Sequence, residues 1–150
     1  MKATRDVLFL SLKPEFAEMI ISGDKTVELR RIRPRALPGT LVLVYASSPV
    51  MKLIGTCIVQ EISVGTPREI WRIHGASTGV NRSGLVKYFH DTERGVAISV
   101  GTPKRFGHPI PLTRVREHLG DSLPPQSFRY ISIRDAIRLI REGSSSRVRV

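Results

Sequence analysis

The sequence predicts a single α+β domain that is mainly β, built as a small β-barrel with short helices packed at its openings. Three observations support this fold class. Several short apolar segments are separated by Gly and Pro turns, short amphipathic helices lie between them, and the helices do not alternate regularly with the strands. The chain has 150 residues, which suits one domain with a core large enough to fold unaided.

The chain opens with a strand and a helix. Residues 7–12 are mostly apolar and predict the first strand. Pro14 suits a first helical turn, where its missing N–H costs nothing, and the apolar residues after it recur at helical spacing. Gly23 stands where a left-handed C-terminal cap is expected. Because so short a helix is marginal alone, it must dock on another part of the molecule.

A charged strand is expected next. In residues 24–31, Val27 and Leu29 alternate with polar residues, which is the period of a half-buried strand. Glu28 and Arg30 therefore project from one face of this strand. Further arginines follow directly, so that positive charge gathers where the strand ends.

Two strands and a helix make up the middle of the chain. Residues 41–46 are apolar throughout and rich in Val, which indicates a strand covered on both faces. Residues 53–62 predict another strand, in which Gly55 marks a bulge or the close approach of a second backbone. Residues 66–75 begin with a capping box and predict a helix.

The second half of the chain predicts shorter elements. In order, they are a loop over 75–84, a helix over 85–90, a strand over 95–100, a basic loop over 102–109, an edge strand over 110–112, a helix over 113–119, a strand over 128–131 and a helix over 132–143. The apolar stripe expected on the last helix is Ile133, Ala136, Ile137 and Ile140. The domain is therefore predicted over residues 1–143, and residues 144–150 are expected to form a flexible basic tail.

The opening segment resembles the ASCH domain, a relative of the PUA domains that bind RNA. The shared pattern is an apolar strand, S-x-K-P, an amphipathic helix and S-G-x-K-T-x-E-x-R-R. Its residues here are Ser11, Lys13, Pro14, Ser22, Gly23, Lys25, Thr26, Glu28, Arg30 and Arg31. Weaker matches in residues 45–49, at Gly55 and in residues 125–130 extend the resemblance over residues 8–130. The resemblance implies a PUA-like barrel with a cleft lined by the G-x-K-x-x-E-x-R residues.

The composition indicates a polyanionic partner. The chain has 24 Lys and Arg against 13 Asp and Glu, a net charge of +11. Such a charge most simply indicates nucleic acid as the partner. The resemblance to PUA-like domains favours RNA over DNA. The alternative is a basic domain with no charged partner.

Several other classes of function are disfavoured. Cys57 is the single cysteine and lies in a predicted buried strand, so no intramolecular disulfide can form and a cytoplasmic location is expected. No apolar run is long enough to cross a bilayer, so no membrane partner is expected. The four histidines lack ligand spacing, and phosphate-loop, dinucleotide and G-x-S-x-G motifs are missing from the sequence. We therefore expect no metal and no cofactor.

Lys25, Glu28 and Arg30 are the sharpest candidates for chemistry, and the first two are the candidate catalytic pair. A lysine beside a carboxylate can hold a phosphate, or act as a base where burial lowers its pKa. Glu28 can serve as a general acid or base, and Arg30 can clamp a phosphate through two N–H groups. Spacing alone favours a solvated ion pair between Glu28 and Arg30, whereas the family resemblance favours the cleft.

A wider set is predicted to contact nucleic acid. The arginines after Arg30 suit phosphate contacts, or alternatively a sheet edge that discourages aggregation. Phe106 is the preferred base-stacking residue because it lies in the predicted basic loop, whereas Tyr45 and Phe89 are expected in the core. The full predicted set is Lys13, Lys25, Glu28, Arg30, Arg31, Arg33, Arg35, Ser47, Arg105, Phe106 and Arg129.

These features predict a nucleic-acid-binding module whose cleft takes a base or a phosphate. The alternative is an enzyme, since proteins similar to the ASCH domain include ribonucleases and amidohydrolases of acetylated cytidine. Lys25 matches the lysine of the amidohydrolase pattern G-x-K-x-x-T, but Glu28 replaces its threonine nucleophile and Thr26 is displaced by two positions. This departure disfavours the amidohydrolase. A metal-independent ribonuclease using Lys25 and Glu28, and a module that senses a small nucleotide, are further alternatives.

Overall fold

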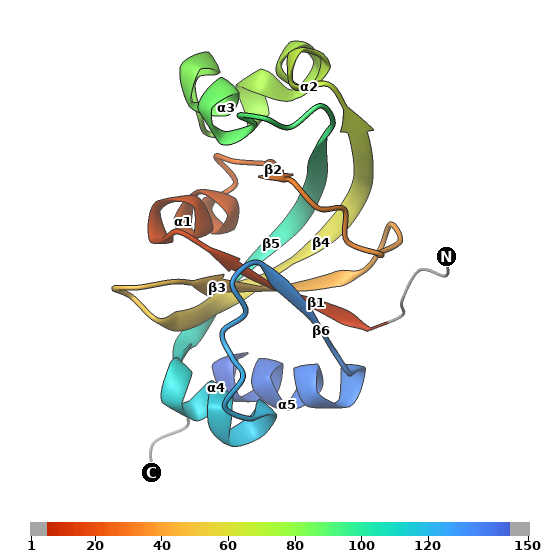
Figure 1. Ribbon diagram of the computed structural model, residues 1–150. Helices are drawn as coiled ribbons and strands as arrows, with labels where there is room; N and C mark the ends of the chain where they lie inside the picture. The colour runs from red at the N-terminus through yellow and green to blue at the C-terminus, as the bar shows by residue number, and fades with distance from the viewer. Residues whose placement is uncertain (1–5, 145–150) are drawn as a thin grey trace.

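The computed structural model describes residues 6–144 and has an open sheet that curls into a half-barrel (Figure 1). Within these residues the sheet has six strands: β1 (Val7–Leu12), β2 (Val27–Arg30), β3 (Leu41–Ala46), β4 (Lys52–Gly65), β5 (Gly95–Pro111) and β6 (Phe128–Ile131). Five α-helices and one 3-10 helix surround it: α1 (Pro14–Ser22), α2 (Pro67–His74), η1 (Gly75–Ser77), α3 (Arg82–Tyr88), α4 (Leu112–Leu119) and α5 (Ile133–Ser144). The mixed α+β fold class predicted from the sequence is confirmed.

The strand order explains how the sheet curls. Across the sheet the order is β2-β5-β4-β3-β1-β6, with β1 and β3 parallel and the other neighbours antiparallel. The β4–β5 pair is the longest, and its register shifts three times. Irregularities of this kind bend a strand and increase its twist. The two edge strands, β2 and β6, consequently approach each other although they are furthest apart in strand order.

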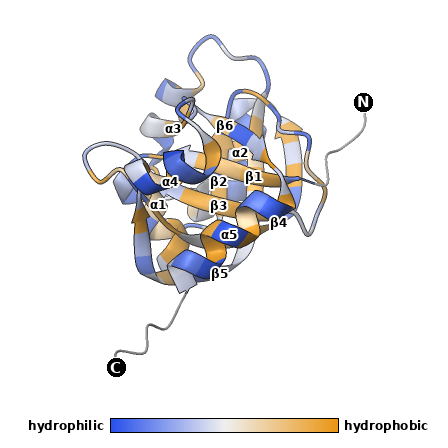
Figure 2. Cartoon of the chain, turned by 90° about the horizontal axis from the view of Figure 1, so that it is seen from below, coloured by the Kyte–Doolittle hydropathy of each residue, from blue (hydrophilic) through white to orange (hydrophobic). Residues whose placement is uncertain are grey.

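Helices cover the sheet in separate groups. α1 packs on one face over a core that includes Leu10, Val44 and Ile98. α4 and α5 cover the other face, and Figure 2 shows both in front of hydrophobic strands. α2 and α3 form a third cluster with β2, in which Leu85 and Phe89 are buried. α3 is thereby held beside β2.

Several local predictions are confirmed. Gly23 caps α1 at a φ of 88°, and Thr66 and Glu69 form the expected capping box of α2. At Gly55 the β5 backbone comes so near that a Cβ would lie 2.2 Å from the Lys104 carbonyl oxygen. Cys57 is fully buried, and this burial raises the pKa of its thiol to about 12.

The predicted loop over residues 102–109 is wrong, because this segment lies within β5, mostly in its second half. Its Pro, Lys, Arg and Gly residues suggest a loop, but β4 extends far enough to pair with it, with Gly55 opposite Arg105. The structure also starts α3 at Arg82, inside a predicted loop, where the Asn81 side chain caps it. Tertiary pairing overrides local composition in such segments.

The last helix also differs from its prediction. α5 buries Ala136, Leu139 and Gly143, whereas Ile133 and Ile137 of the predicted stripe remain exposed. Gly143 does not end the helix, since it packs against Phe106 and the helix continues to Ser144. The rest of the predicted tail, residues 145–150, lies outside the described residues. Among residues 6–144, no helix is both long and apolar enough to cross a membrane.

Candidate functional site

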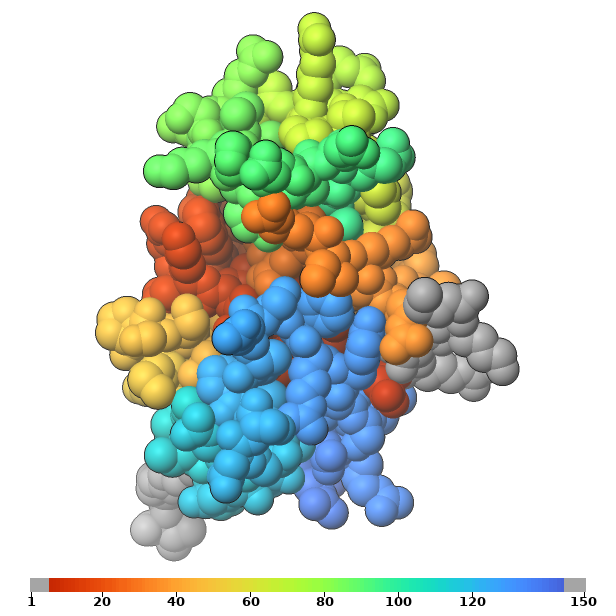
Figure 3. Space-filling view, in the orientation of Figure 1, coloured from red at the N-terminus to blue at the C-terminus, as the bar shows by residue number. Residues whose placement is uncertain are grey.

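A cleft of about 820 Å³ opens where the two edges of the sheet approach each other. Its walls come from the end of β1, α1, β2, α3 and the segment before β6, and these segments meet on one face of the molecule (Figure 3). The lining side chains include Ser11, Lys13, Phe16, Lys25, Glu28, Arg30, Arg31, Ile32, Ser47, Lys87, Tyr88, Gln126 and Ser127.

Three buried charges line this cleft. Glu28 Oε1 lies 3.2 Å from Lys25 Nζ, and Glu28 Oε2 accepts a hydrogen bond from Arg30 Nε at 2.8 Å and lies 2.7 Å from Arg30 Nη2. Lys25 is 2 % exposed, Glu28 7 % and Arg30 8 %. Glu28 and Arg30 do share one strand face, but the solvated surface pair favoured by spacing alone is wrong, because α1 and α3 flank the pair in the cleft.

Every N–H group of this network has an acceptor. Lys25 Nζ donates to the carbonyl oxygens of Val27, at 2.9 Å, and Thr78, and its third partner is Glu28. The Arg30 guanidinium also donates to Ser11 O at 2.9 Å, Ser127 O at 3.2 Å and Ser127 Oγ at 2.9 Å.

Arg30 therefore connects the two edges of the sheet. It extends from β2 to β1 and to the residue before β6, and so fixes the shape of the cleft. Buried charges of this kind are tolerated only when they are paired and hydrogen-bonded.

The network presents positive charge to the cleft. Two cations and one anion leave one positive charge when all three groups are ionised. Burial lowers the pKa of Lys25, Glu28 opposes this shift, and Arg30 adds to it. The Lys25 ammonium also lies 5.1 Å from the centre of the Phe16 ring. The positive charge is thus held in a fixed, partly dehydrated place.

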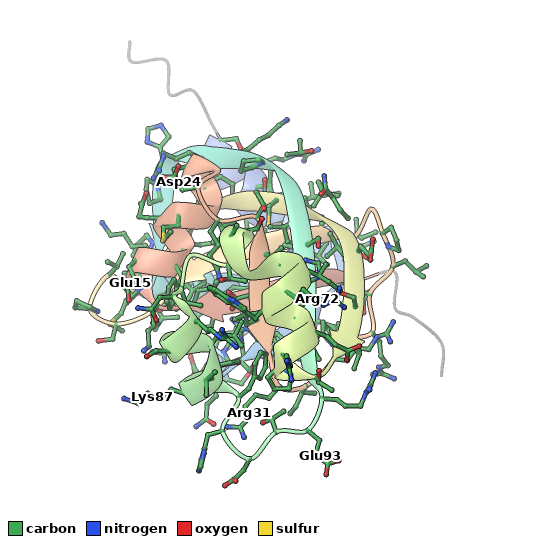
Figure 4. All side chains as sticks on the ribbon, turned by 90° about the horizontal axis from the view of Figure 1, so that it is seen from above. Glu15, Asp24, Arg31, Arg72, Lys87 and Glu93 are labelled. Carbon is green, nitrogen blue, oxygen red and sulfur yellow. The ribbon has the colours of Figure 1, made fainter. Side chains whose placement is uncertain are left out.

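Further cations lie around the mouth of the cleft. Lys13, Arg31 and Lys87 are exposed and line it. Arg31 Nη2 donates to the His90 carbonyl oxygen at 2.8 Å, and Figure 4 shows Arg31 and Lys87 on the same side of the molecule. These three residues are called the rim cations below.

The structure places the predicted site residues in two groups. Lys13, Lys25, Glu28, Arg30, Arg31 and Ser47 line the cleft. Arg33, Arg35, Arg105, Phe106 and Arg129 do not contribute to its lining. Arg35 lies over the Tyr130 ring instead, at 5.5 Å, and Arg129 donates to Ser122 Oγ.

The predictions that depended on the basic loop need correction. Phe106 is only 4 % exposed and packs in the core beneath α5, so its ring is unavailable to stack a base. Arg105 forms an exposed, two-pronged ion pair with Glu18 of α1, with contacts of 2.9 and 2.6 Å. Both outcomes follow from the pairing of this segment with β4.

Comparison with known proteins places this arrangement in a family. The ASCH domain model matches residues 10–104, which include β2 and the buried charges. The chain belongs to the ASCH domain family. This agrees with the resemblance carried by its opening segment.

The relatives of this ASCH domain extend the likeness to nearly the whole chain. The protein is 30% identical over 131 residues to an "ASCH domain-containing ribonuclease" of Zymomonas mobilis, covering 87% of this chain and 88% of the relative. A crystal structure of a mutant ASCH protein from Z. mobilis has a TM-score of 0.87 at 29% identity, covering 92% of this chain and 96% of that one. The N-terminal domain of McrB from Staphylothermus marinus, at 10% identity and a TM-score of 0.56, shares the fold alone, over 91% of this chain and 96% of that one.

Sequence reasoning missed several groups in the cleft of this ASCH domain. Tyr88 and Lys87 lie at the end of α3, and Gln126 and Ser127 precede β6. Ser127 lies within the match over residues 125–130, and this match was the available signal for it. The sequence contains no comparable signal for Tyr88, which enters the cleft through the packing of α3 against β2.

Within residues 6–144, no three side chains of His, Cys, Asp or Glu gather as a metal site requires.

Proposed function

We propose that this ASCH domain binds RNA in its cleft and cleaves it there as a ribonuclease. The observation that carries the proposal is the buried, net-positive network of Lys25, Glu28 and Arg30, surrounded at the cleft mouth by the rim cations. The name of the Z. mobilis relative, which aligns over nearly its whole length, supports the same activity.

The chemistry proposed is transfer of a phosphodiester within the RNA itself. The 2′-oxygen passes its proton to water and attacks the adjacent phosphorus, and the bond from phosphorus to the 5′-oxygen breaks as that oxygen takes a proton from water. The products are a 2′,3′-cyclic phosphate and a 5′-hydroxyl end. Negative charge grows on the non-bridging oxygens in the transition state, and a preorganised positive charge stabilises it most effectively in a site of this kind.

The cleft residues divide this work. Lys25 and Glu28 act through fixed charge rather than by moving a proton, because the N–H groups and both carboxylate oxygens already have partners. Arg30 holds the cleft walls together and adds to the field at the phosphate. The rim cations bind flanking phosphates, contacts that give affinity without reading sequence.

The second candidate is an RNA-binding module without chemistry, which was the first expectation from the sequence. One observation favours it: the network offers no free base, because its polar atoms are engaged within the protein. A single experiment separates the two functions.

The experiment follows an end-labelled single-stranded RNA in EDTA, by gel and by filter binding. An otherwise identical oligonucleotide with 2′-deoxy sugars serves as the uncleavable control. We expect cleavage of the RNA to cyclic-phosphate ends, and binding without cleavage of the deoxy control. Salt-sensitive binding with intact RNA would establish the binding module, and neither binding nor cleavage would overturn both functions.

A charge-matched pair of variants guards against a contaminating nuclease. Lys13→Ala/Lys87→Ala removes two rim cations, whereas Lys52→Ala/Lys104→Ala removes two exposed lysines that do not line the cleft. Both variants lose the same net charge. We expect only Lys13→Ala/Lys87→Ala to weaken binding and raise KM several-fold. Cleavage by a contaminating nuclease would be the same in both variants.

A further inference from the structure

Two large apolar side chains remain exposed at the mouth of the cleft. Ile32 follows β2 and is 69 % exposed, and Tyr88 ends α3 and is 40 % exposed. Both line the cleft, although they come from segments far apart in the sequence. Exposed apolar groups inside a concave, charged site mark a place for a ligand with an apolar face.

Each of these side chains stands next to a cation in the sequence. Arg31 precedes Ile32, Lys87 precedes Tyr88, and all four residues line the cleft. The pattern repeats on two separate elements, and Figure 4 shows Arg31 and Lys87 toward the same side. Alternation of a positive group with a flat or apolar surface is the arrangement that binds single-stranded nucleic acid.

The Tyr88 ring is held in place by the protein core. It meets the Phe89 ring edge to face, with ring centres 5.0 Å apart, and Phe89 is only 2 % exposed. Burial raises the pKa of the Tyr88 hydroxyl, and Glu28, Arg30 and Arg31 all act on it electrostatically. The ring lines the same cleft as the buried charges, and because Phe89 holds it in place, little conformational entropy is lost when a ligand stacks on it.

We propose that Tyr88 and Ile32 form a platform for one unpaired nucleobase of the bound RNA, with Arg31 and Lys87 binding the phosphates beside it. This inference rests on the proposed function, which it deepens by defining the substrate as RNA with an unstacked base next to the buried charges. Apolar surfaces carry no hydrogen-bond code, so the platform accepts every base. A paired base keeps its faces stacked inside the helix and is excluded.

The test uses a single-stranded oligonucleotide with 2′-deoxy sugars throughout and 2-aminopurine at one position, so that no 2′-oxygen is present to start cleavage. Stacking of 2-aminopurine on an aromatic ring quenches its fluorescence. The label is moved along the oligonucleotide, and the wild-type protein is expected to quench it most strongly at one position. Tyr88→Phe should retain the quench and the affinity, whereas Tyr88→Ala should lose the quench and weaken binding about tenfold.

The matched control is Val86→Ala on the same helix. Val86 is 59 % exposed and does not contribute to the cleft lining, so its loss should change neither quench nor affinity. In the cleavage assay, Tyr88→Ala should raise KM and leave kcat near the wild-type value, because the ring binds the base without touching the reacting phosphate. If Tyr88→Ala fails to fold by circular dichroism, Ile32→Ala repeats the comparison. Its control is Leu37→Ala, because Leu37 is 55 % exposed and does not contribute to the cleft lining.

An oligonucleotide with an abasic site at the quenched position completes the design. The abasic oligonucleotide should bind the wild-type protein about as weakly as the intact oligonucleotide binds Tyr88→Ala. Combining the abasic oligonucleotide with Tyr88→Ala should weaken binding no further. Independent, additive losses, or a quench that persists in Tyr88→Ala, would overturn the platform while wild-type binding still supported the proposed function. Wild-type protein that neither binds nor cleaves RNA would instead overturn the proposed function.

Discussion

Glu28 lies between two buried cations and is the residue on which the cleft depends most. Its two carboxylate oxygens pair with Lys25 and Arg30, whose other contacts join β2 to Thr78, Ser11 and Ser127. A buried ion pair contributes little net stability compared with an apolar pair, but loss of one partner is costly because the other charge stays buried. The network is therefore sensitive to single changes.

The first prediction is that Glu28→Gln destabilises the fold by about 3 kcal/mol, within the range for breaking a buried pair. The amide preserves the shape of the side chain but removes the charge that compensates two cations. The free energy of unfolding is measured by urea denaturation. Glu61→Gln, a change at an exposed acid of β4, is the control and should have little effect. Equal midpoints for the two variants would contradict the role assigned to Glu28.

The second prediction concerns the pH dependence of stability. The pKa of Lys25 is lowered from its usual 10.5, chiefly by burial. Between the folded and unfolded pKa values the unfolded chain binds more protons, so the free energy of unfolding rises with pH. The cost of burying the charge is complete below the folded pKa and disappears as the pH approaches 10.5.

Lys25→Met removes this titration. The free energy of unfolding of the wild type, relative to that of Lys25→Met, is expected to rise as the pH increases toward 10.5. Urea denaturation at a series of pH values measures the difference. The contributions of the other lysines and of the tyrosines are common to both proteins and cancel in the difference. A difference that stays flat or falls would show that burial does not lower this pKa.

At the scale of elements, the β4–β5 pair determines where the other parts lie. β5 packs with β2 at one end and supports Phe106 under α5 at the other. Its close approach to β4 occurs at Gly55, where a Cβ would also lie 2.8 Å from Ile21 of α1. The same glycine thus allows the sheet pairing and the docking of α1.

The third prediction compares two glycines of this pair. Gly55→Ala forces a methyl group against the Lys104 carbonyl oxygen, whereas a Cβ at Gly107 meets nothing within 4 Å. Overpacking of this kind costs about 1–3 kcal/mol. We expect Gly55→Ala to lower the thermal midpoint clearly and Gly107→Ala to leave it near the wild-type value. A lower thermal midpoint for Gly107→Ala than for Gly55→Ala would mean that β4 and β5 can separate at Gly55 without loss of stability.

At the scale of the whole molecule, the curl of the open sheet creates the cleft. β2 and β6 are opposite edges in strand order, yet Arg30 hydrogen-bonds to Ser127, just before β6. The chain has a net charge of +11, and the rim cations lie around this cleft. Positive charge of this kind increases the rate of encounter with a polyanion and makes binding depend on salt.

The fourth prediction is the slope of that salt dependence. Each phosphate neutralised on a single strand contributes about −0.7 to the slope of log K against log salt. Contact with the three rim cations therefore predicts a slope of about −2 or steeper for wild type. Lys13→Ala/Lys87→Ala should make the slope shallower by about 1.4, and Lys52→Ala/Lys104→Ala should change it little. Equal slopes in the two variants would mean that binding follows net charge and not the cleft.

Local signals predicted the ends of α1 and α2 and the polar face of β2 well. Gly23 and the capping box of α2 were located correctly, because turns and caps depend on a few neighbouring residues. The strand period placed Glu28 and Arg30 on one face, where they pair. Whether the face with Glu28 and Arg30 is buried depends on distant parts of the chain. Spacing alone therefore favoured a solvated face, which is wrong.

Phe106 and α5 show where local reasoning failed. A segment of Pro, Lys, Arg and Gly became a strand because β4 supplied hydrogen-bond partners along its length. Pairing then placed Phe106 in the core, where it packs against Gly143, and α5 turned the face with Ala136 and Leu139 inward. Because α5 turns this face inward, Ile133 and Ile137 of the predicted stripe remain exposed.

The sequence by itself determined the fold class, the family, the basic character and the three charges of the network, since each depends on residue type and short-range spacing. Only the tertiary structure decided that these charges are buried, that Tyr88, Ile32 and Ser127 join them, and that Arg105 and Phe106 do not. The physical reason is that burial and proximity depend on which distant strands pair and how the sheet curls. Those contacts join residues nearly a hundred positions apart, such as Arg30 and Ser127.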